Sequence, residues 1–222
     1  MNILLIAPPV FDFYNTPHRM EPLGLLYIQK ALRNEGHRAE IYDATASGKV
    51  KKQQTPPELA YLSEFYEEDR SPFSLHNGYK RFGDSFNAIC GHVSQNNYDI
   101  IGISSLFSAY HPDVENLTAE IKKVFKGPVV IGGTAVNAQK ETMMKTTNAD
   151  YLIHGSGTVP MVQFVKAVSG MIPFDKVDGL IYRDGEKITI NEASKEPAWS
   201  GGLIPDREHL RIFRKKRLAK TV

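Results

Sequence analysis

The stretch VVIGGTAVNAQ, residues 129–139, decides how the rest of the sequence is interpreted. Apolar residues that favour strands run directly into Gly132 and Gly133, and small and polar residues follow without a lysine in the turn. Glycine in a strand costs backbone entropy, so two of them at a strand end indicate a sharp turn or the close approach of another group. A tight strand-to-helix turn and a ligand lying on the backbone both meet that requirement.

The composition is that of a globular protein, because 41% of the 222 residues are hydrophobic and 23% are charged. No window is apolar enough to span a membrane, and we expect the opening MNILLIAPP to be a strand rather than a signal peptide. Cys90 is the single cysteine, which excludes internal disulfides and an Fe–S cluster held by this chain alone. We therefore expect no membrane partner and a cytoplasmic location.

Strands alternate with helices along the chain. Buried-strand patterns cover residues 2–7, 38–43, 98–104, 128–131 and 150–153, and helical spacing of apolar residues covers 22–35, 114–125 and 161–168. This alternation predicts right-handed βαβ units in an α/β, doubly wound, flavodoxin-like (Rossmann-like) fold. Because five such strands are visible, we expect a five-stranded parallel sheet in the order 2-1-3-4-5 rather than the six-stranded dinucleotide-binding topology.

Two segments depart from this minimal pattern. The first is a long insertion after strand two, at about residues 45–81, which is polar but rich in aromatic residues and is expected to fold over the sheet edge or over a site. The second is GLIYRDGEKITIN, which predicts a C-terminal β-hairpin joined by Asp184-Gly185. We expect an α/β domain over 1–175, the hairpin and a linker over 176–206, and a basic tail over 207–222.

Four loops are candidates for a binding site, because open parallel sheets bind ligands outside the carboxyl ends of their strands. They read APPVFDFYNTPHRMEP, SSLFSAYHPD, GGTAVNAQ and HGSGTVP. The last three consist largely of small residues, so a broad, flat or long ligand can contact their backbone in a roomy and nearly uncharged site. Phosphate-binding P-loops, the G-x-G-x-x-G fingerprint and the nucleophile elbow are all absent from the sequence.

Four segments resemble the N-terminal cobalamin-binding domain of cobalamin-dependent radical S-adenosylmethionine enzymes, over roughly residues 1–206. The opening strand leads into a Pro-Leu-Gly-Leu helix start and a Gly-His second strand, and DIIGISSLFSAYHPD carries the Ser-x-Leu motif of cobalamin domains. VVIGGTAVNAQ is similar to the Gly-Gly loop of that family, and ADYLIHGSGTVP to its Asp-Tyr-x-x-x-Gly-Glu-Gly-Glu segment.

The resemblance implies that the chain holds base-off cobalamin at the carboxyl ends of the strands, with the Gly-Gly backbone against the nucleotide tail and the serines hydrogen-bonded to it. Side chains at the two glycines would then block the tail. No residue of this chain is implied to be catalytic. The implied cofactor-binding residues are Pro8, Pro9, Ser104, Ser105, Leu106, Gly132, Gly133, Thr134, Val136, Asn137, Gly155, Ser156 and Gly157.

The departures from the family pattern narrow these expectations. Asp12 and His18 are too far apart for the Asp-x-His-x-x-Gly motif, so a histidine lower ligand from His18 is not expected, and Ser156 and Thr158 replace the family's glutamates. The Cys-x-x-x-Cys-x-x-Cys motif is absent. This chain alone is therefore not expected to be catalytic, and S-adenosylmethionine and a 4Fe-4S cluster are expected only in a radical catalytic domain, in cis or in trans.

Two other functions stay open on the residues alone. A flavin- or nucleotide-binding enzyme of the same fold is disfavoured because PPVFDFY lacks the Ser, Thr and Gly residues that hold phosphate. An interaction domain that has lost its ligand fits the replaced glutamates and the missing histidine motif. Nucleic acid is not expected as a partner, because the net charge is +2 and few aromatic residues lie among the basic residues of the tail.

Overall fold

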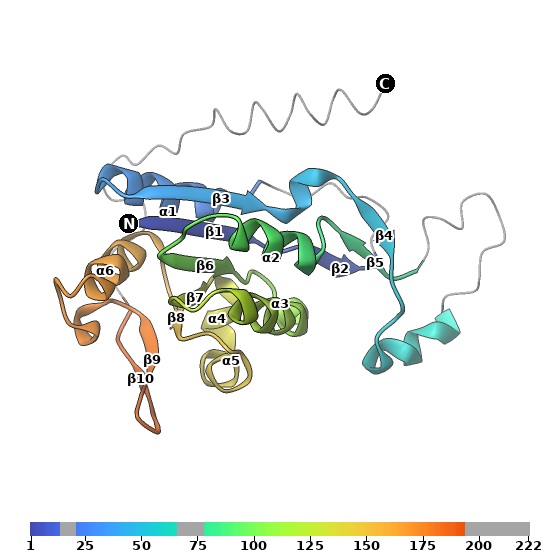
Figure 1. Cartoon of the computed structure of the whole chain (residues 1–222). Coiled ribbons are helices and arrows are strands. Elements are labelled where there is room, and N and C mark those ends of the chain that lie inside the picture. Colours follow the sequence, from blue (N-terminus) through green and yellow to red (C-terminus); the bar gives the residue numbers. More distant parts are fainter. Residues whose placement is uncertain (14–20, 66–77, 194–222) are drawn as a thin grey trace.

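The computed structural model describes residues 1–13, 21–65 and 78–193 (Figure 1). Five parallel strands run from one edge of its main sheet in the order β3-β1-β6-β7-β8. This is the predicted order 2-1-3-4-5, so the predicted α/β fold is confirmed. The five strands are β1 (Asn2–Ala7), β3 (Arg38–Asp43), β6 (Ile100–Ser104), β7 (Val129–Gly132) and β8 (Tyr151–Ile153).

The C-terminal hairpin extends the main sheet to seven strands. It consists of β9 (Leu180–Asp184) and β10 (Lys187–Ile190), and β9 pairs antiparallel with β8. Asp184 pairs with Lys187, so the two-residue turn is Gly185-Glu186, one residue beyond the predicted Asp184-Gly185. Gly185 has a φ of +61°, and this left-handed conformation, which glycine adopts without strain, fixes the turn there.

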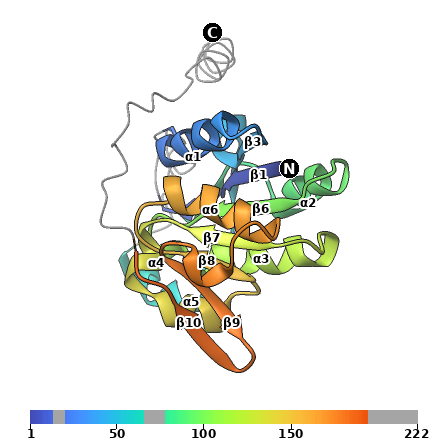
Figure 2. The ribbon, with the colours of Figure 1, turned by 90° about the vertical axis from the view of Figure 1, so that its left-hand side faces the viewer.

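Helices cover both faces of the main sheet (Figure 2). Successive residues of β1 point to opposite faces, as the pleat requires. Leu4 and Ile6 pack with α2, α3, α4 and α5 in one buried cluster, and Ile3 and Leu5 pack with α1 and α6 in the other. None of the described helices is both long and apolar enough to cross a membrane. The helices are α1 (Leu23–Asn34), α2 (Phe86–Ser94), α3 (His111–Val124), α4 (Thr134–Ala138), α5 (Lys140–Thr146) and α6 (Thr158–Val168).

A second, three-stranded antiparallel sheet was not predicted from the sequence; we call it the small sheet. Its order is β2-β5-β4, and it joins the loop after β1 to both ends of the insertion. Since β2 follows β1 directly after Pro8-Pro9, the small sheet lies beyond the carboxyl end of β1 (Figure 1). Its strands are β2 (Val10–Asp12), β4 (Val50–Lys52) and β5 (Lys80–Phe82). The 3-10 helices within the described residues are η1 (Ala44–Ser47), η2 (Pro57–Phe65), η4 (Ser108–Tyr110) and η5 (Phe174–Lys176).

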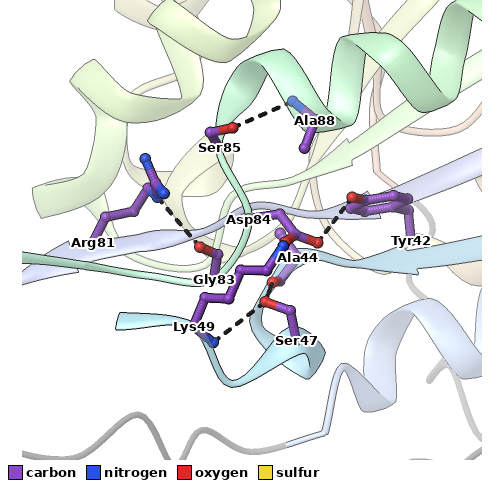
Figure 3. A network of polar contacts seen from close by, with 9 residues as sticks. All are labelled: Tyr42, Ala44, Ser47, Lys49, Arg81, Gly83, Asp84, Ser85 and Ala88. Carbon is purple, nitrogen blue, oxygen red and sulfur yellow. Dashed lines mark hydrogen bonds and ion pairs between the residues drawn. The ribbon is translucent and has the colours of Figure 1, made fainter. Parts of the chain in front are cut away.

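A polar network ties the small sheet to the main one (Figure 3). Asp84, just after β5, accepts hydrogen bonds from Lys49 Nζ at 2.8 Å and from the Tyr42 hydroxyl at 3.0 Å. The next residue, Ser85, caps α2 by accepting from the Ala88 N–H at 3.3 Å. Burial by itself would raise the pKa of Asp84, but the hydrogen bonds from Lys49 and Tyr42 outweigh it and leave this pKa below its ordinary value.

We expect Asp84→Asn to lower the free energy of unfolding at pH 7 by about 1–2 kcal/mol, since two charge-assisted contacts are weakened and Lys49 is largely exposed. The folded-state pKa is depressed, so this stabilisation exists above the unfolded pKa of about 4 and is lost as the pH falls through the folded value. Urea unfolding at pH 7 and pH 3 measures it. Asp175→Asn, at an exposed carboxylate, is the control. Equal stability of Asp84→Asn and wild type at pH 7 would refute the role of this network.

Candidate functional site

Three of the four candidate loops meet where β6, β7 and β8 end. The Ser105 N–H donates to the Gly132 carbonyl at 2.7 Å, and the Ala135 N–H donates to the Ser105 carbonyl at 3.1 Å. The Gly155 N–H donates to Asn137 Oδ1 at 2.7 Å, which joins the β8 loop to α4. The structure thus brings the β6, β7 and β8 loops into one hydrogen-bonded group.

Gly132 and Gly133 have different roles at the end of β7. Gly133 has a φ of +120°, and a Cβ placed on it would lie 2.3 Å from the Ser105 carbonyl oxygen. The group that approaches Gly133 is therefore the protein's own backbone. A Cβ on Gly132 would meet only the Ile153 carbonyl oxygen, at an ordinary 3.7 Å, so the space beside Gly132 stays open. The close approach of a ligand therefore remains a possible reason for glycine at position 132 and not at position 133.

A buried hydroxyl without a partner belongs to Ser105, whose N–H donates to the Gly132 carbonyl. Ser105 is 2% exposed, and its Oγ has no hydrogen-bond partner among the described residues. An unsatisfied buried polar group costs about 1–3 kcal/mol, so such groups mark positions where a ligand or water completes the bonding. Ser104 precedes it as the last residue of β6 and pairs with Gly132.

The remaining predicted site residues divide by location. Thr134 and Asn137 are exposed at the start and side of α4, whereas Val136 is buried in the core and offers a ligand only its backbone. A Cβ on Gly157 would lie 3.1 Å from Ile28 Cδ1, so this glycine allows α6 to pack on α1. Ser156 is half-buried in the same loop, and Pro8 and Pro9 lie between β1 and β2, at the junction of the two sheets.

Large apolar side chains are exposed at the same end of the main sheet. Leu106 is 55% exposed and Phe107 61%, and the Phe107 ring lies edge-on to Tyr110 at 5.8 Å between centroids. Leu23 and Val159, which begin α1 and α6, are also exposed. Of these four, only Leu106 was singled out from the sequence. An apolar surface beside an open backbone suits a large, partly apolar ligand.

Two histidines near these loops make protein contacts, although the buried Nδ1 of His111 has no hydrogen-bond partner among the described residues. His154 is 8% exposed and its Nε2 lies 2.9 Å from the Asn191 carbonyl oxygen, which ties β8 to the chain after the hairpin. His111 begins α3 as expected, and its Nε2 lies 2.8 Å from Thr146 Oγ1. His18 lies outside the described residues. No group of three metal-ligating side chains occurs within residues 1–13, 21–65 and 78–193.

An acidic group on the small-sheet side corrects the expectation of a nearly uncharged site. The Tyr110 hydroxyl donates to Asp12 Oδ2 at 2.6 Å. Burial, helped by the carboxylates of Asp12 and Glu58, raises the pKa of the nearby Asp113 to about 7. Burial and the same three carboxylates raise the pKa of Tyr79 to about 12. The sequence could not reveal this group, because its members come from β2, η2 and α3.

This arrangement of fold and loops matches a known protein family. The family model described as the B12 binding domain matches residues 48–165, which is more than half of the chain and includes β6, β7, β8 and their loops. The chain belongs to the B12-binding domain family. The resemblance stated from the sequence is thereby confirmed, and with it cobalamin as the cofactor of the family.

Several known proteins share this B12-binding domain. The cytidylyl-2-hydroxyethylphosphonate methyltransferase of Streptomyces wedmorensis is 26% identical over 184 residues, which cover 82% of this chain and 31% of that protein. The cobalamin-dependent S-adenosylmethionine radical enzyme OxsB, with aqua-cobalamin and S-adenosylmethionine bound, is 15% identical with a TM-score of 0.69, over 97% of this chain and 25% of that one. The radical S-adenosylmethionine methyltransferase TsrM of Kitasatospora setae, with cobalamin and a 4Fe-4S cluster bound, is 14% identical with a TM-score of 0.57, over 92% and 31%.

The two structural likenesses show a common fold. The chain spans 31% of the length of the curated relative and 25–31% of the two solved chains, so it corresponds to one part of each.

We expect Gly133→Ala to cost about 2–4 kcal/mol of unfolding free energy, because the new Cβ would overlap the Ser105 carbonyl at a φ that L-residues rarely adopt. Gly132→Ala is the matched control and should cost about 1 kcal/mol or less, since its Cβ finds space. Urea unfolding followed by circular dichroism measures both. Equal losses of unfolding free energy for the two variants would show that the contact between Gly133 and the Ser105 carbonyl does not constrain residue 133 as expected.

The raised pKa of Asp113 predicts a pH-dependent stability. Because the folded pKa of about 7 exceeds the unfolded value, the neutral carboxyl is favoured in the fold, and stability falls as the pH rises from about 4 through about 7. We expect Asp113→Asn to be more stable than wild type at pH 8.5 by about 1 kcal/mol, after allowance for solvent screening, and equal to it near pH 4. Urea unfolding at both pH values measures the difference. Glu186→Gln, in the exposed hairpin turn, should show none. A constant difference at all pH values would contradict the assignment.

Proposed function

We propose that this chain binds base-off cobalamin at the carboxyl ends of β6, β7 and β8 and presents it to a radical S-adenosylmethionine catalytic domain of the methyltransferase or rearrangement type. The observation that carries the proposal is the buried, unpartnered hydroxyl of Ser105, whose N–H donates to the Gly132 carbonyl in a B12-binding domain. Bound cobalamin supplies a cobalt centre that accepts and transfers a methyl group or single electrons, and this domain supplies binding and orientation.

The residues of the site fit the two parts of such a ligand. The Ser105 hydroxyl can donate to an oxygen of the nucleotide tail, and the lack of a side chain on Gly132 leaves that tail room. Asn137, Gly155 and Ser156 border the same opening. The exposed side chains of Leu106 and Phe107 offer apolar area to the macrocycle.

The histidine contacts bear on how cobalt would be ligated. The Nε2 atoms of His154 and His111 lie against the Asn191 carbonyl and Thr146 Oγ1, and the buried Nδ1 of His111 has no partner among the described residues. The motif that would place His18 under cobalt is absent from the sequence. The proposed base-off form rests on the family resemblance, and no histidine of this chain is proposed to replace the nucleotide base.

The partner of the domain is a radical catalytic domain, in cis or in trans. The relatives named above are longer than this chain and carry the corresponding region as 25–31% of their length. The proposed division is an α/β domain over 1–175, the hairpin and linker over 176–206, and a basic tail over 207–222 that leads towards the catalytic domain. The proposed location is the cytoplasm.

Titration with hydroxocobalamin followed by desalting tests the function. We expect wild type to retain the cobalamin absorbance bands, shifted to the base-off positions. We expect Ser105→Ala to weaken binding about fivefold, the value of one hydrogen bond of about 1 kcal/mol. Ser108→Ala, an exposed serine in the same loop, should bind as wild type does. His18→Ala should leave the bound spectrum unchanged.

The outcomes separate the open functions. Retention of flavin or a nucleotide in place of cobalamin would favour the enzyme alternative. No retention of any ligand by wild type would favour an interaction domain that has lost its ligand. A changed spectrum of the His18→Ala complex would show that His18 ligates cobalt, which contradicts the proposed lack of a histidine ligand and leaves cobalamin binding intact.

A further inference from the structure

The small sheet carries cationic side chains that no described carboxylate neutralises. Lys49 pairs with Asp84, but Lys51, Lys52 and Arg81 form no ion pair with any described residue. Lys51 and Lys52 are exposed, whereas Arg81 is half-buried. The net charge of the whole chain is only +2, so this local excess is a property of the small sheet and not of the average surface.

The strand register sets these cations directly opposite one another. Lys51 of β4 pairs with Arg81 of β5, and Lys52 pairs with Lys80. Because side chains alternate, the first pair lies on one face of the small sheet and the second on the other. Burial, and secondarily the charge of Lys52, lowers the pKa of Lys80. Like charges in directly opposed positions destabilise a sheet, so the Lys51–Arg81 pair works against the strand pairing that creates it, whereas Lys80 also faces Asp12 of β2.

Protection of a sheet edge does not account for this pattern. Lysine on an edge strand prevents pairing with other chains, and β4 is such an edge in the order β2-β5-β4. Arg81, however, lies on the central strand, between Lys51 on one side and Phe11 on the other. A cation at this inner position adds repulsion without protecting an edge.

The geometry of Arg81 suits an oxyanion. Its Nε donates to the Gly83 carbonyl at 3.2 Å, which holds the guanidinium beside Gly83 and not beside Asp84 (Figure 3). This bond leaves the terminal N–H groups of the planar fork available for two oxygens of one anion. The opposed Lys51 adds a second charge at cross-strand distance, and partial burial of Arg81 reduces screening by salt.

The position of the small sheet relates its positive charge to the candidate functional site. The small sheet continues from β1, so it lies at the same end of the molecule as the loops of β6, β7 and β8 (Figure 1). An anion bound between β4 and β5 is therefore held at the end of the molecule where the proposed cofactor lies.

We propose that Lys51 and Arg81, which share one face of the small sheet, form a binding site for the phosphate or phosphonate group of a small-molecule substrate. That the ligand is the substrate rests on the proposed function; that the small sheet binds the anion does not. The shared chemistry is a tetrahedral oxyanion with two or more oxygens that accept charge-assisted hydrogen bonds.

The test titrates the full 222-residue chain with inorganic phosphate and with phenyl phosphate, at constant ionic strength set with chloride, and follows backbone amide signals by NMR. We expect saturable shifts confined to β4, β5 and the residues joining them to the sheet. The double variant Lys51→Gln/Arg81→Gln should bind about tenfold more weakly for each charge removed. Lys126→Gln/Lys187→Gln, at two exposed lysines outside the small sheet, is the matched control and should bind as wild type does.

Thermal unfolding keeps the test independent of any folding defect. Since the double variant removes an opposed cation pair, its midpoint without phosphate should be no lower than that of wild type. Added phosphate should raise the midpoint of wild type and not that of the variant. Equal phosphate binding by the two proteins would overturn the proposal, and so would shifts that do not saturate and spread over all lysines.

Two further measurements separate this proposal from others. Hydroxocobalamin retention by the double variant should equal that of wild type, so a failed anion site and a failed cobalamin site give different results. Vesicles containing phosphatidylserine are added in place of phosphate to test a lipid source of the anion. Binding to vesicles without binding of phenyl phosphate would assign the surface to a membrane and overturn the small-molecule proposal.

Discussion

The candidate site depends on one backbone contact, between Gly133 and the Ser105 carbonyl. Because Gly133 has no side chain, the chain after β7 turns at a φ of +120° directly against the loop after β6, and the Ser105 carbonyl accepts the Ala135 N–H. This contact sets the separation of the two loops and accompanies the burial of the Ser105 side chain. Gly132 is left with open space because its neighbour makes the turn. The open space at Gly132 and the turn at Gly133 thus follow from how two adjacent parallel strands end.

Local pattern was sufficient for the main sheet and insufficient for the small one. β1 and β3 begin and end where the sequence predicts, because each is a run bounded by residues that stop it, such as Pro8 and Gly36. β2, β4 and β5 have three residues each and pair across long stretches of sequence, so no periodicity develops within any of them. The hairpin turn differed by one residue because Asp184 remained in the ladder with Lys187.

The same distinction applies to the site. The Gly and Ser loops could be predicted because their residue types and their positions after buried strands are both local information. The carboxylates of Asp12 and Asp113 could not, since more than one element must fold before they approach each other. The different roles of Gly132 and Gly133 could not be predicted from the sequence, because the carbonyl oxygen that contacts only Gly133 belongs to Ser105, in another loop.

The hydrogen bonds after the hairpin have a mechanical consequence. His154, at the end of β8, contacts the Asn191 carbonyl, and the Gly179 N–H donates to the Glu192 carbonyl, so the outgoing chain is fastened beside the Gly155 loop. A Cβ on Gly155 would lie 3.0 Å from the Ala193 side chain, which shows how closely the two segments run. The position of residues 191–193 and the conformation of the β8 loop are therefore tied together by these few contacts.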